Sequence, residues 1–298
     1  MSTLPGPNDD PFAPADEVPF SPVRTAMGWI RFAFLHTLGG GRAVLELIGG
    51  MVLLFVAACR WIGRSVYDRK VRLGKSAVVS QIVRVGVRSV FIVSLVSGCV
   101  GLILALQLAP PLDEFGGKSA VANIIGVAVL RELGPLIGSI VLTGFAGASI
   151  AAQLGTMVVS EEIEALEAHA LNPIRFLVVP RVIACAASMT CLAVVANTVA
   201  IGAAMGISVT VMDIPAQEYW ANTLAQCKPI DLFTGLFKAL IFGVLIGVVS
   251  CHNGLSVDPR DGADGVGKAT TNTVVQCVVA IILADLVFTA VFFALDLN

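Results

Sequence analysis

The stretch SVFIVSLVSGCVGLILALQLA, residues 89–109, contains no charged residue and runs directly into Pro110 and Pro111. About 20 consecutive apolar residues suffice for a helix to cross the hydrocarbon core of a bilayer, and paired prolines end such a helix. Over the whole chain of 298 residues, 56% are hydrophobic and 13% are charged, against a usual charged share of about 25%. So few charges cannot cover a water-soluble surface, and the sequence therefore predicts an all-α membrane protein.

Four further apolar stretches follow this segment along the chain. Residues 119–158 are interrupted only by the charged pair Arg131-Glu132, with Gly134-Pro135 directly after it. Either one long bent helix or a short helix followed by a span from about residue 135 fits this pattern. The remaining stretches are 182–211, 231–251 and 270–294. Together with 89–109, they predict five transmembrane helices.

An earlier apolar stretch, residues 43–62, is bordered by basic residues. Its unbroken run from Ile48 to Cys59 is shorter than the roughly 20 residues that a span needs. The basic residues at and after its end are Arg60, Arg64, Arg69, Lys70, Arg72, Lys75, Arg84 and Arg88. An apolar helix beside a cationic segment favours an N-terminal interfacial amphipathic helix on the cytoplasmic leaflet. A short sixth span is the alternative.

The placement of Lys and Arg predicts the orientation, because basic residues concentrate in cytoplasmic loops. With five spans and the N-terminus inside, most of the 19 basic residues face the cytoplasm. The exceptions, on the outer side or within its leaflet, are Lys118, Arg131, Lys228 and Lys238. We therefore expect the N-terminus inside and the C-terminus outside. A sixth span at 43–62 would spoil this pattern.

Three regions follow from these features. Residues 1–24 are rich in proline and acidic residues, which predicts a disordered cytoplasmic tail. Residues 25–84 hold the interfacial helix and the basic juxtamembrane segment. Residues 85–298 form the membrane domain.

Small residues repeat every four positions along the second span, in two neighbouring ridges. The ridges are Gly144, Ala148 and Ala152, and Gly147, Ala151 and Gly155. Small residues let helix backbones approach closely within a membrane. We expect a close helix–helix contact here, either within one chain or between two.

The loop after the second span, residues 160–173, is acidic although it faces the cytoplasm. Ser160 is a candidate N-cap, and Asn172-Pro173 is expected to end the helix. Its apolar face holds Ile163, Leu166 and Ala170, and its other positions hold Glu161, Glu162, Glu164 and Glu167. The pattern favours a short helix that docks into a basic groove of a soluble partner. A solvated charged loop is the alternative.

Two charges fall deep inside predicted spans, Lys238 in the fourth and Asp285 in the fifth. They lie at similar depths below the outer ends of their helices, so they can form an ion pair, as charges in hydrocarbon usually do. Snorkelling of Lys238 to the interface is the alternative.

Motifs for metal binding, catalysis and nucleotide binding fail on inspection. None of the 7 cysteines lies in a CxxC pair, and the 3 histidines are far apart, which predicts no metal site. The sequence GADGVGK at 262–268 matches the start of a phosphate-binding loop, but Ala269 replaces the required Ser or Thr and no strand precedes it. No nucleophile motif occurs. The chain is therefore not expected to be an enzyme or an ATPase.

Several stretches, taken together, resemble the MlaE/YrbE family of ABC-transporter permeases over roughly residues 45–298. They are LRELGP at 130–135, GAS at 147–149, LGTM at 154–157, EEIEALE at 161–167, NPIR at 172–175, VPR at 179–181, NG at 253–254, GVGKATT at 265–271 and DLVFT at 285–289. The resemblance implies a permease in the bacterial inner membrane that moves phospholipid or another hydrophobic lipid between that membrane and the envelope.

The resemblance also implies partners. The loop at 160–173 would be the coupling helix that contacts a separate cytoplasmic ABC ATPase, with acidic family positions at Glu161 and Glu167. ATP and Mg²⁺ would bind to that ATPase, and no cofactor to this chain. An MCE-domain protein would sit on the outer side, a second permease copy or paralogue would complete a dimer, and no nucleic acid is involved.

Lipid would be held between the two permeases, near the first and second spans, where Gln107 is a polar candidate. The chain departs from well-studied members at two positions of the second span: Phe145 stands where they have Arg, and Gln153 where they have Glu. These departures imply a less charged cavity.

A second hypothesis is an ion-coupled secondary transporter of a hydrophobic substrate. Such a protein needs intramembrane carboxylates or a proton relay, and only Lys238, Asp285 and Arg131-Glu132 qualify. An acidic docking helix has no purpose in that class. A lipid-modifying intramembrane enzyme is disfavoured because nucleophile and metal ligands are missing.

Overall fold

The computed structural model describes residues 45–64, 75–114 and 120–295, and all regular structure in these ranges is helical. The chain divides into two parts, residues 1–49 and 50–298, and nearly all described residues belong to the second. The predicted tail at 1–24 and the basic residues at 69–72 lie outside the described ranges.

Six described helical segments are long and apolar enough to cross a membrane: Leu45–Arg64, Ser76–Leu112, Val121–Val159, Ile174–Val211, Pro229–Leu255 and Pro259–Ala294. The last five correspond to the predicted spans, and the helical membrane fold is confirmed. The first is a helix of 20 residues. The unbroken apolar run is shorter than this helix, because the charged residues Glu46, Arg60 and Arg64 also lie within it.

The segment Val121–Val159 is one continuous helix, which settles the alternative left open by the sequence. It comprises α4 (Ala120–Ala128), α5 (Gly134–Leu142) and α6 (Ala148–Val159), joined by π-helical segments at Val129–Leu133 and Thr143–Gly147. Each π-helical turn widens the helix locally, and such turns are frequent at functional sites. The first of them contains the charged pair Arg131-Glu132.

The helix α8 (Val179–Val211) is the centre of the packing. It lies against α3 (Val90–Glu114), α10 (Pro229–Leu255) and α2 (Lys75–Val85). In an apolar 18-residue window of its candidate span 61% of the residues are buried, against 11% for the corresponding window of the span that contains α11 (Gly262–Ala294). The exposed side of α11 is apolar, as expected for a helix that faces lipid.

One glycine brings α10 very close to the first π-helical segment. A Cβ added at Gly235 would lie 2.0 Å from the carbonyl oxygen of Leu130, so only glycine permits this approach. The contact holds α10 directly beside Arg131 and Glu132.

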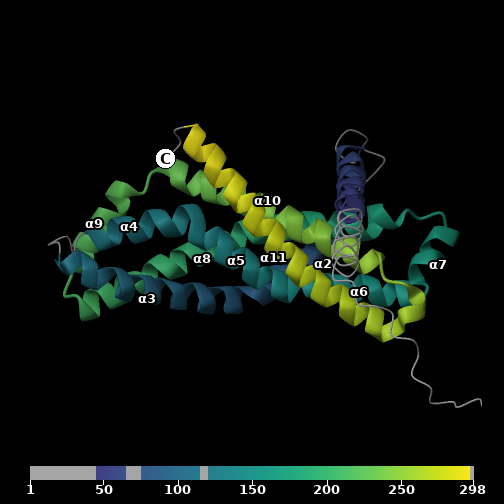
Figure 1. Cartoon of the computed structure of the whole chain (residues 1–298), viewed down its shortest axis with the longest axis horizontal. Coiled ribbons are helices and arrows are strands. Elements are labelled where there is room, and N and C mark those ends of the chain that lie inside the picture. Colours follow the sequence, from purple (N-terminus) through teal and green to yellow (C-terminus); the bar gives the residue numbers. More distant parts are fainter. Residues whose placement is uncertain (1–44, 65–74, 115–119, 296–298) are drawn as a thin grey trace, which may run out of the picture. The chain divides into compact units, whose positions relative to one another are not determined.

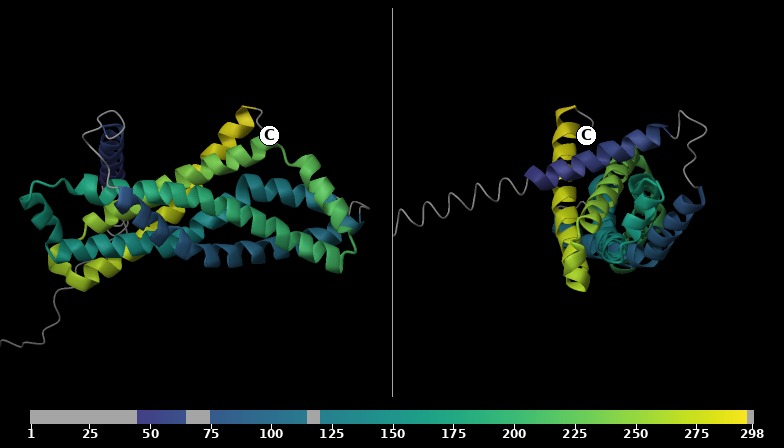
Figure 2. Two further views of the ribbon diagram at one scale, coloured as in Figure 1. Left: turned by 180° about the vertical axis from the view of Figure 1, so that it is seen from behind. Right: turned by 90° about the vertical axis from the view of Figure 1, so that its right-hand side faces the viewer.

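The connections between helices lie at two opposite ends of this part of the molecule. The short helix α7 (Glu162–Ala168) lies at one end with the connection between α10 and α11, and α9 (Ala216–Gln226) lies at the other (Figures 1 and 2). The five segments after residue 75 therefore alternate in direction, as consecutive spans do.

Residues 50–64 of the first helix run across the direction of α8 in both figures. Ala58 is fully buried there, and Met51 and Leu54 pack against the same core. A helix that lies in the membrane interface would have this direction relative to the spans. Its interfacial location stays a prediction, as does the orientation of the whole chain.

Candidate functional site

The acidic loop forms a single short helix, α7, and all four of its glutamates are exposed. Ile163 and Leu166 are half-buried on its other side, as the pattern predicts. The prediction that Ser160 caps this helix was wrong. Ser160 ends α6 and its hydroxyl donates to the carbonyl oxygen of Thr156 at 2.9 Å, while Glu161 occupies the N-cap position in the left-handed conformation, with φ 59°.

The helix ends earlier than the sequence indicates. Ala170 also adopts a left-handed conformation, with φ 56°, and the N–H of Leu171 reaches back to the carbonyl oxygen of Leu166 at 3.0 Å. This is the Schellman pattern of a helix C-terminus. Ala170 therefore lies outside the helix and is exposed rather than on its apolar face.

Asn172 begins the next helix instead of ending α7. Its side-chain oxygen accepts hydrogen bonds from the backbone N–H groups of Ile174, at 3.0 Å, and Arg175, at 3.3 Å. Pro173 directly precedes the π-helical segment Ile174–Val178, which leads into α8. The loop is thus a short helix between two residues in the left-handed conformation, Glu161 and Ala170. Asn172 then caps the helix that follows.

Inside the bundle, Lys238 joins three helical segments. It is 1% exposed, and its Nζ atom donates to Glu132 Oε1 at 2.6 Å, to Asp285 Oδ1 at 3.0 Å and to Thr289 Oγ1 at 3.1 Å. An ammonium group has three donors, so these bonds use all of them. The structure thus places Lys238 beside Asp285, and Glu132 adds a second carboxylate to the pair.

A second ion pair lies next to this group. Arg131 Nε donates to Asp231 Oδ1 at 2.6 Å, and Asp231 Oδ2 accepts the backbone N–H of Lys228 at 2.8 Å at the start of α10. The two pairs connect the first π-helical segment to α10 and α11. They let these helices carry charges within an apolar environment, where an unpaired charge would be strongly unfavourable.

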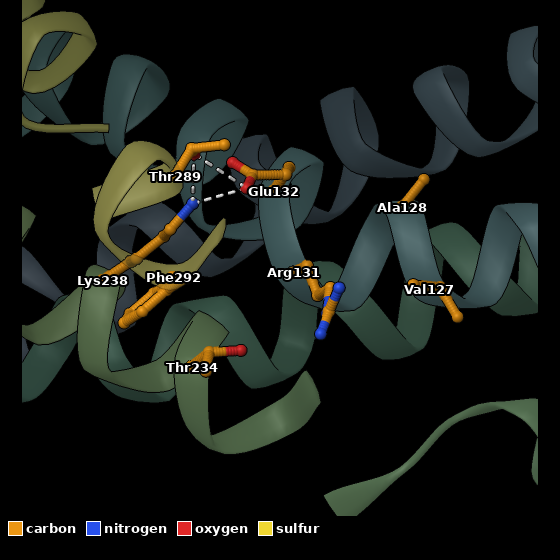
Figure 3. Close-up of a pocket in the computed structure, with 8 residues that line it drawn as sticks. All are labelled: Val127, Ala128, Arg131, Glu132, Thr234, Lys238, Thr289 and Phe292. Carbon is orange, nitrogen blue, oxygen red and sulfur yellow. Dashed lines mark hydrogen bonds and ion pairs between the residues drawn. The ribbon is translucent and has the colours of Figure 1, made fainter. Parts of the chain in front are cut away.

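Four of these residues, Arg131, Glu132, Lys238 and Thr289, border a cavity of about 150 Å³. Figure 3 shows Lys238, Glu132 and Thr289 pointing toward one another, with Phe292 beside the Lys238 chain. The Nζ atom of Lys238 lies 5.8 Å from the centre of the Phe292 ring, within the range of a cation–π contact. The cavity has room for a small polar group but not for a whole lipid.

The two small-residue ridges of the second span have different surroundings. On one ridge, a Cβ at Gly147 would meet Ser250 and one at Gly155 would meet Val257, while Ala151 is fully buried. This ridge packs on α10 and the residues after it. On the other ridge, Gly144 is exposed and has no described atom within 4 Å of the place of its Cβ.

The lipid-cavity candidates are not brought together by the described chain. Gln107 is exposed on α3, and Phe145 is 45% exposed in the second π-helical segment. Gln153 is half-buried and donates from Nε2 to Ser149 Oγ at 3.0 Å. None of the three lines the cavity at Lys238.

From the sequence, Arg131 and Glu132 were noted only as intramembrane charges, and neither they nor Asp231 were selected as site residues. The signal available for the first two was a charged pair inside an otherwise apolar stretch. Asp231 gave no signal, because it lies at the start of a predicted span, where charges are common.

The sequence of the chain is similar to those of known permeases. A family model described as Permease MlaE matches residues 78–291. Probable ABC transporter permease proteins of Rickettsia prowazekii and Synechocystis sp. are 33% and 32% identical, covering 73% and 72% of this chain and 83% and 81% of theirs. The chloroplastic protein TRIGALACTOSYLDIACYLGLYCEROL 1 of Arabidopsis thaliana is 33% identical, over 72% of this chain and 61% of that protein.

The family match includes α7, both π-helical segments of the second span and every residue bonded to Lys238. The resemblance seen in the sequence motifs is confirmed. Such a protein is a transporter subunit rather than an enzyme, and the six apolar helices in the described part of the chain make it a multi-pass membrane protein. The chain belongs to the MlaE permease family.

Proposed function

We propose that this chain is the permease subunit of an ABC transporter that moves phospholipid or another hydrophobic lipid between the bacterial inner membrane and the cell envelope. A separate cytoplasmic ABC ATPase, which binds ATP and Mg²⁺, supplies the energy. The observation that carries the proposal is α7, an exposed acidic helix at one end of the spans in a chain related to ABC permeases.

The chemistry of α7 suits docking into a basic groove. Its glutamates extend into solvent, and those in its first turn lie at the positive end of the helix dipole. Charge complementarity of this kind speeds association and excludes wrong partners. Asn172 and Pro173 then fix the direction in which the chain re-enters the bundle.

A lipid as substrate is supported by the relatives and by the apolar surface. One relative is named for trigalactosyldiacylglycerol, a glycolipid. Phe145 and the neighbouring Gly144 are exposed on the second span. An apolar side chain at position 145 suits acyl chains better than anionic headgroups, and Gln107 and Gln153 add neutral polar groups.

Two further partners belong to the proposal. An MCE-domain protein sits on the outer side, at the end where α9 lies. A second copy of the chain or a paralogue completes a dimer, and the exposed Gly144, on the ridge with the half-buried Ala148 and Ala152, allows close helix contact.

The group of charges around Lys238 is the observation that favours the second candidate, an ion-coupled secondary transporter. Carboxylates within the membrane are typical of such proteins. ATP-dependent lipid movement that persists when ion gradients are collapsed would exclude this candidate. Movement that follows a proton or sodium gradient without ATP would favour it.

The test is a gentle-detergent pull-down of the chain from its native membrane, with mass spectrometry of the proteins and lipids that accompany it. We expect an ABC ATPase, an MCE-domain protein and a defined set of lipids. Recovery of the chain without any ATPase, under conditions that preserve other ABC complexes, would contradict the proposal.

A further inference from the structure

The position of α7 is not fixed by packing of the helix itself. None of its residues is buried, and among described elements it packs mainly on α6, the helix that it follows. At the two ends of the helix, Glu161 and Ala170 occupy the left-handed region, which non-glycine residues rarely adopt. Something outside α7 must therefore set its direction.

In the π-helical segment that follows the α7 loop, Arg175 contacts the first helix of the chain. The guanidinium carbon of Arg175 lies 5.6 Å from the centre of the Trp61 ring and 5.3 Å from that of Phe176. Arg64, one turn after Trp61, lies 5.6 Å from the same indole ring. Trp is the aromatic side chain that attracts cations most strongly. The backbone N–H of Arg175 also donates to the side-chain oxygen of Asn172. The contact between Trp61 and Arg175 is therefore linked to the cap beside α7.

The helix that carries Trp61 is itself anchored to the bundle. Ala58 is fully buried, and Met51, Leu54 and Ile62 pack against the same core. At Gly50 the helix passes so close to His252 of α10 that an added Cβ would lie 2.5 Å from the imidazole Cε1. The indole of Trp61 is thus presented to Arg175 from a fixed support.

We infer that residues 50–64 form an arm that positions α7, with Trp61 and Arg175 as its positioning residues. The arm holds the chain between the exposed helix α7 and the buried residue Val178, directly before α8. This inference rests on the proposed function in one respect, since α7 matters for transport only if it meets the ATPase.

The test compares three single variants of the full chain in lipid nanodiscs, without ATPase, by amide hydrogen exchange. Trp61→Leu keeps an apolar side chain but removes the aromatic face, whereas Trp61→Phe keeps a face for the cation. Phe55→Leu is the matched control, an aromatic residue of the same helix that is 41% exposed. We expect Trp61→Leu to speed exchange in residues 163–171 about two- to thirty-fold, the range of a cation–π contact. Trp61→Phe and Phe55→Leu should stay near the wild type.

Exchange in α8 separates positioning from a general loss of fold. Unchanged exchange of α7 in Trp61→Leu would overturn the inference, and so would equally faster exchange in α8, since Trp61 would then act on the whole bundle. Adding the ATPase tests the proposed function separately. If α7 exchange responds to Trp61→Leu while no α7 variant alters ATPase binding, the positioning stands and the proposed function fails.

Discussion

Lys238 shows how this chain places a cation inside a membrane bundle. Its three donors meet Glu132, Asp285 and Thr289 from two other segments, and its side chain is almost completely buried. The ammonium group of Lys238 offsets the repulsion between the two carboxylates that it contacts. Loss of the ammonium therefore affects three segments of the bundle at once.

Replacing Lys238 by Met should destabilise the protein by about 3–5 kcal/mol, because it leaves two carboxylates close together without a cation. Thermal unfolding of the purified permease in detergent measures the effect. Lys268→Met is the control, since its ion pair with Asp264 is exposed and should matter little. Combining Lys238→Met with Glu132→Gln and Asp285→Asn should recover much of the loss. A single variant as stable as the wild type would show that the charges do not depend on one another.

Gly235 is the second residue on which the polar group depends, through the backbone. A Cβ there would collide with the carbonyl oxygen of Leu130, so Gly235→Ala should destabilise the permease by about 1–3 kcal/mol through overpacking. Gly267→Ala on α11 is the matched control, because no atom of the described residues contacts its Cβ position within 4 Å, and alanine favours helix there. Unfolding temperatures of the two variants should move in opposite directions. The same direction for both would contradict the close contact.

At the scale of elements, the C-terminal end of α7 places a non-glycine residue in a strained backbone conformation. Ala170 has φ 56° in the Schellman turn, and glycine adopts this conformation without strain. Ala170→Gly should therefore stabilise the end of α7 by about 1 kcal/mol, and slower amide exchange in residues 165–171 measures it. Ala165→Gly, the same change within α7, should speed exchange there. Faster exchange in both variants would contradict the left-handed turn.

The sequence was sufficient to predict the elements that depend on composition. Long apolar stretches predicted the spans, and Lys238 and Asp285 were selected because charges are rare at that depth. Glu132 was not paired with them, because it lies 106 residues before Lys238 and only the tertiary fold brings it near. The ends of α7 were misplaced because Glu161 and Ala170 are left-handed without being glycine. Trp61 gave no signal, since its partner Arg175 follows a different helix.

At the scale of the whole molecule, the five segments after residue 75 alternate in direction, so the connections between them lie at two opposite ends. Cys227, between α9 and α10, lies at the end opposite α7. Burial, and to a lesser extent the charge of Asp231, raises the pKa of its thiol. Less thiolate is then present at neutral pH, so its alkylation should be slow near pH 7 and speed up as the pH rises further.

The proposed orientation predicts that Cys227 is alkylated from outside intact cells, by a membrane-impermeant maleimide at alkaline pH. A variant that keeps Cys227 as its single cysteine removes the other six thiols. A fluorescent protein fused to the N-terminus should fold inside, and alkaline phosphatase fused to the C-terminus should be active outside. Both termini on the same side would show that Leu45–Arg64 spans the membrane as a sixth helix.

The central claim, that α7 couples this permease to an ABC ATPase, is tested most directly by charge reversal on α7. The measurement is lipid-stimulated ATP hydrolysis by the permease–ATPase complex in nanodiscs, with Glu161→Lys and Glu167→Lys combined. Glu218→Lys is the matched control, an exposed glutamate on α9 at the opposite end. We predict that the double variant folds but loses the stimulation, while the control keeps it. Stimulation unchanged in the double variant would contradict the account.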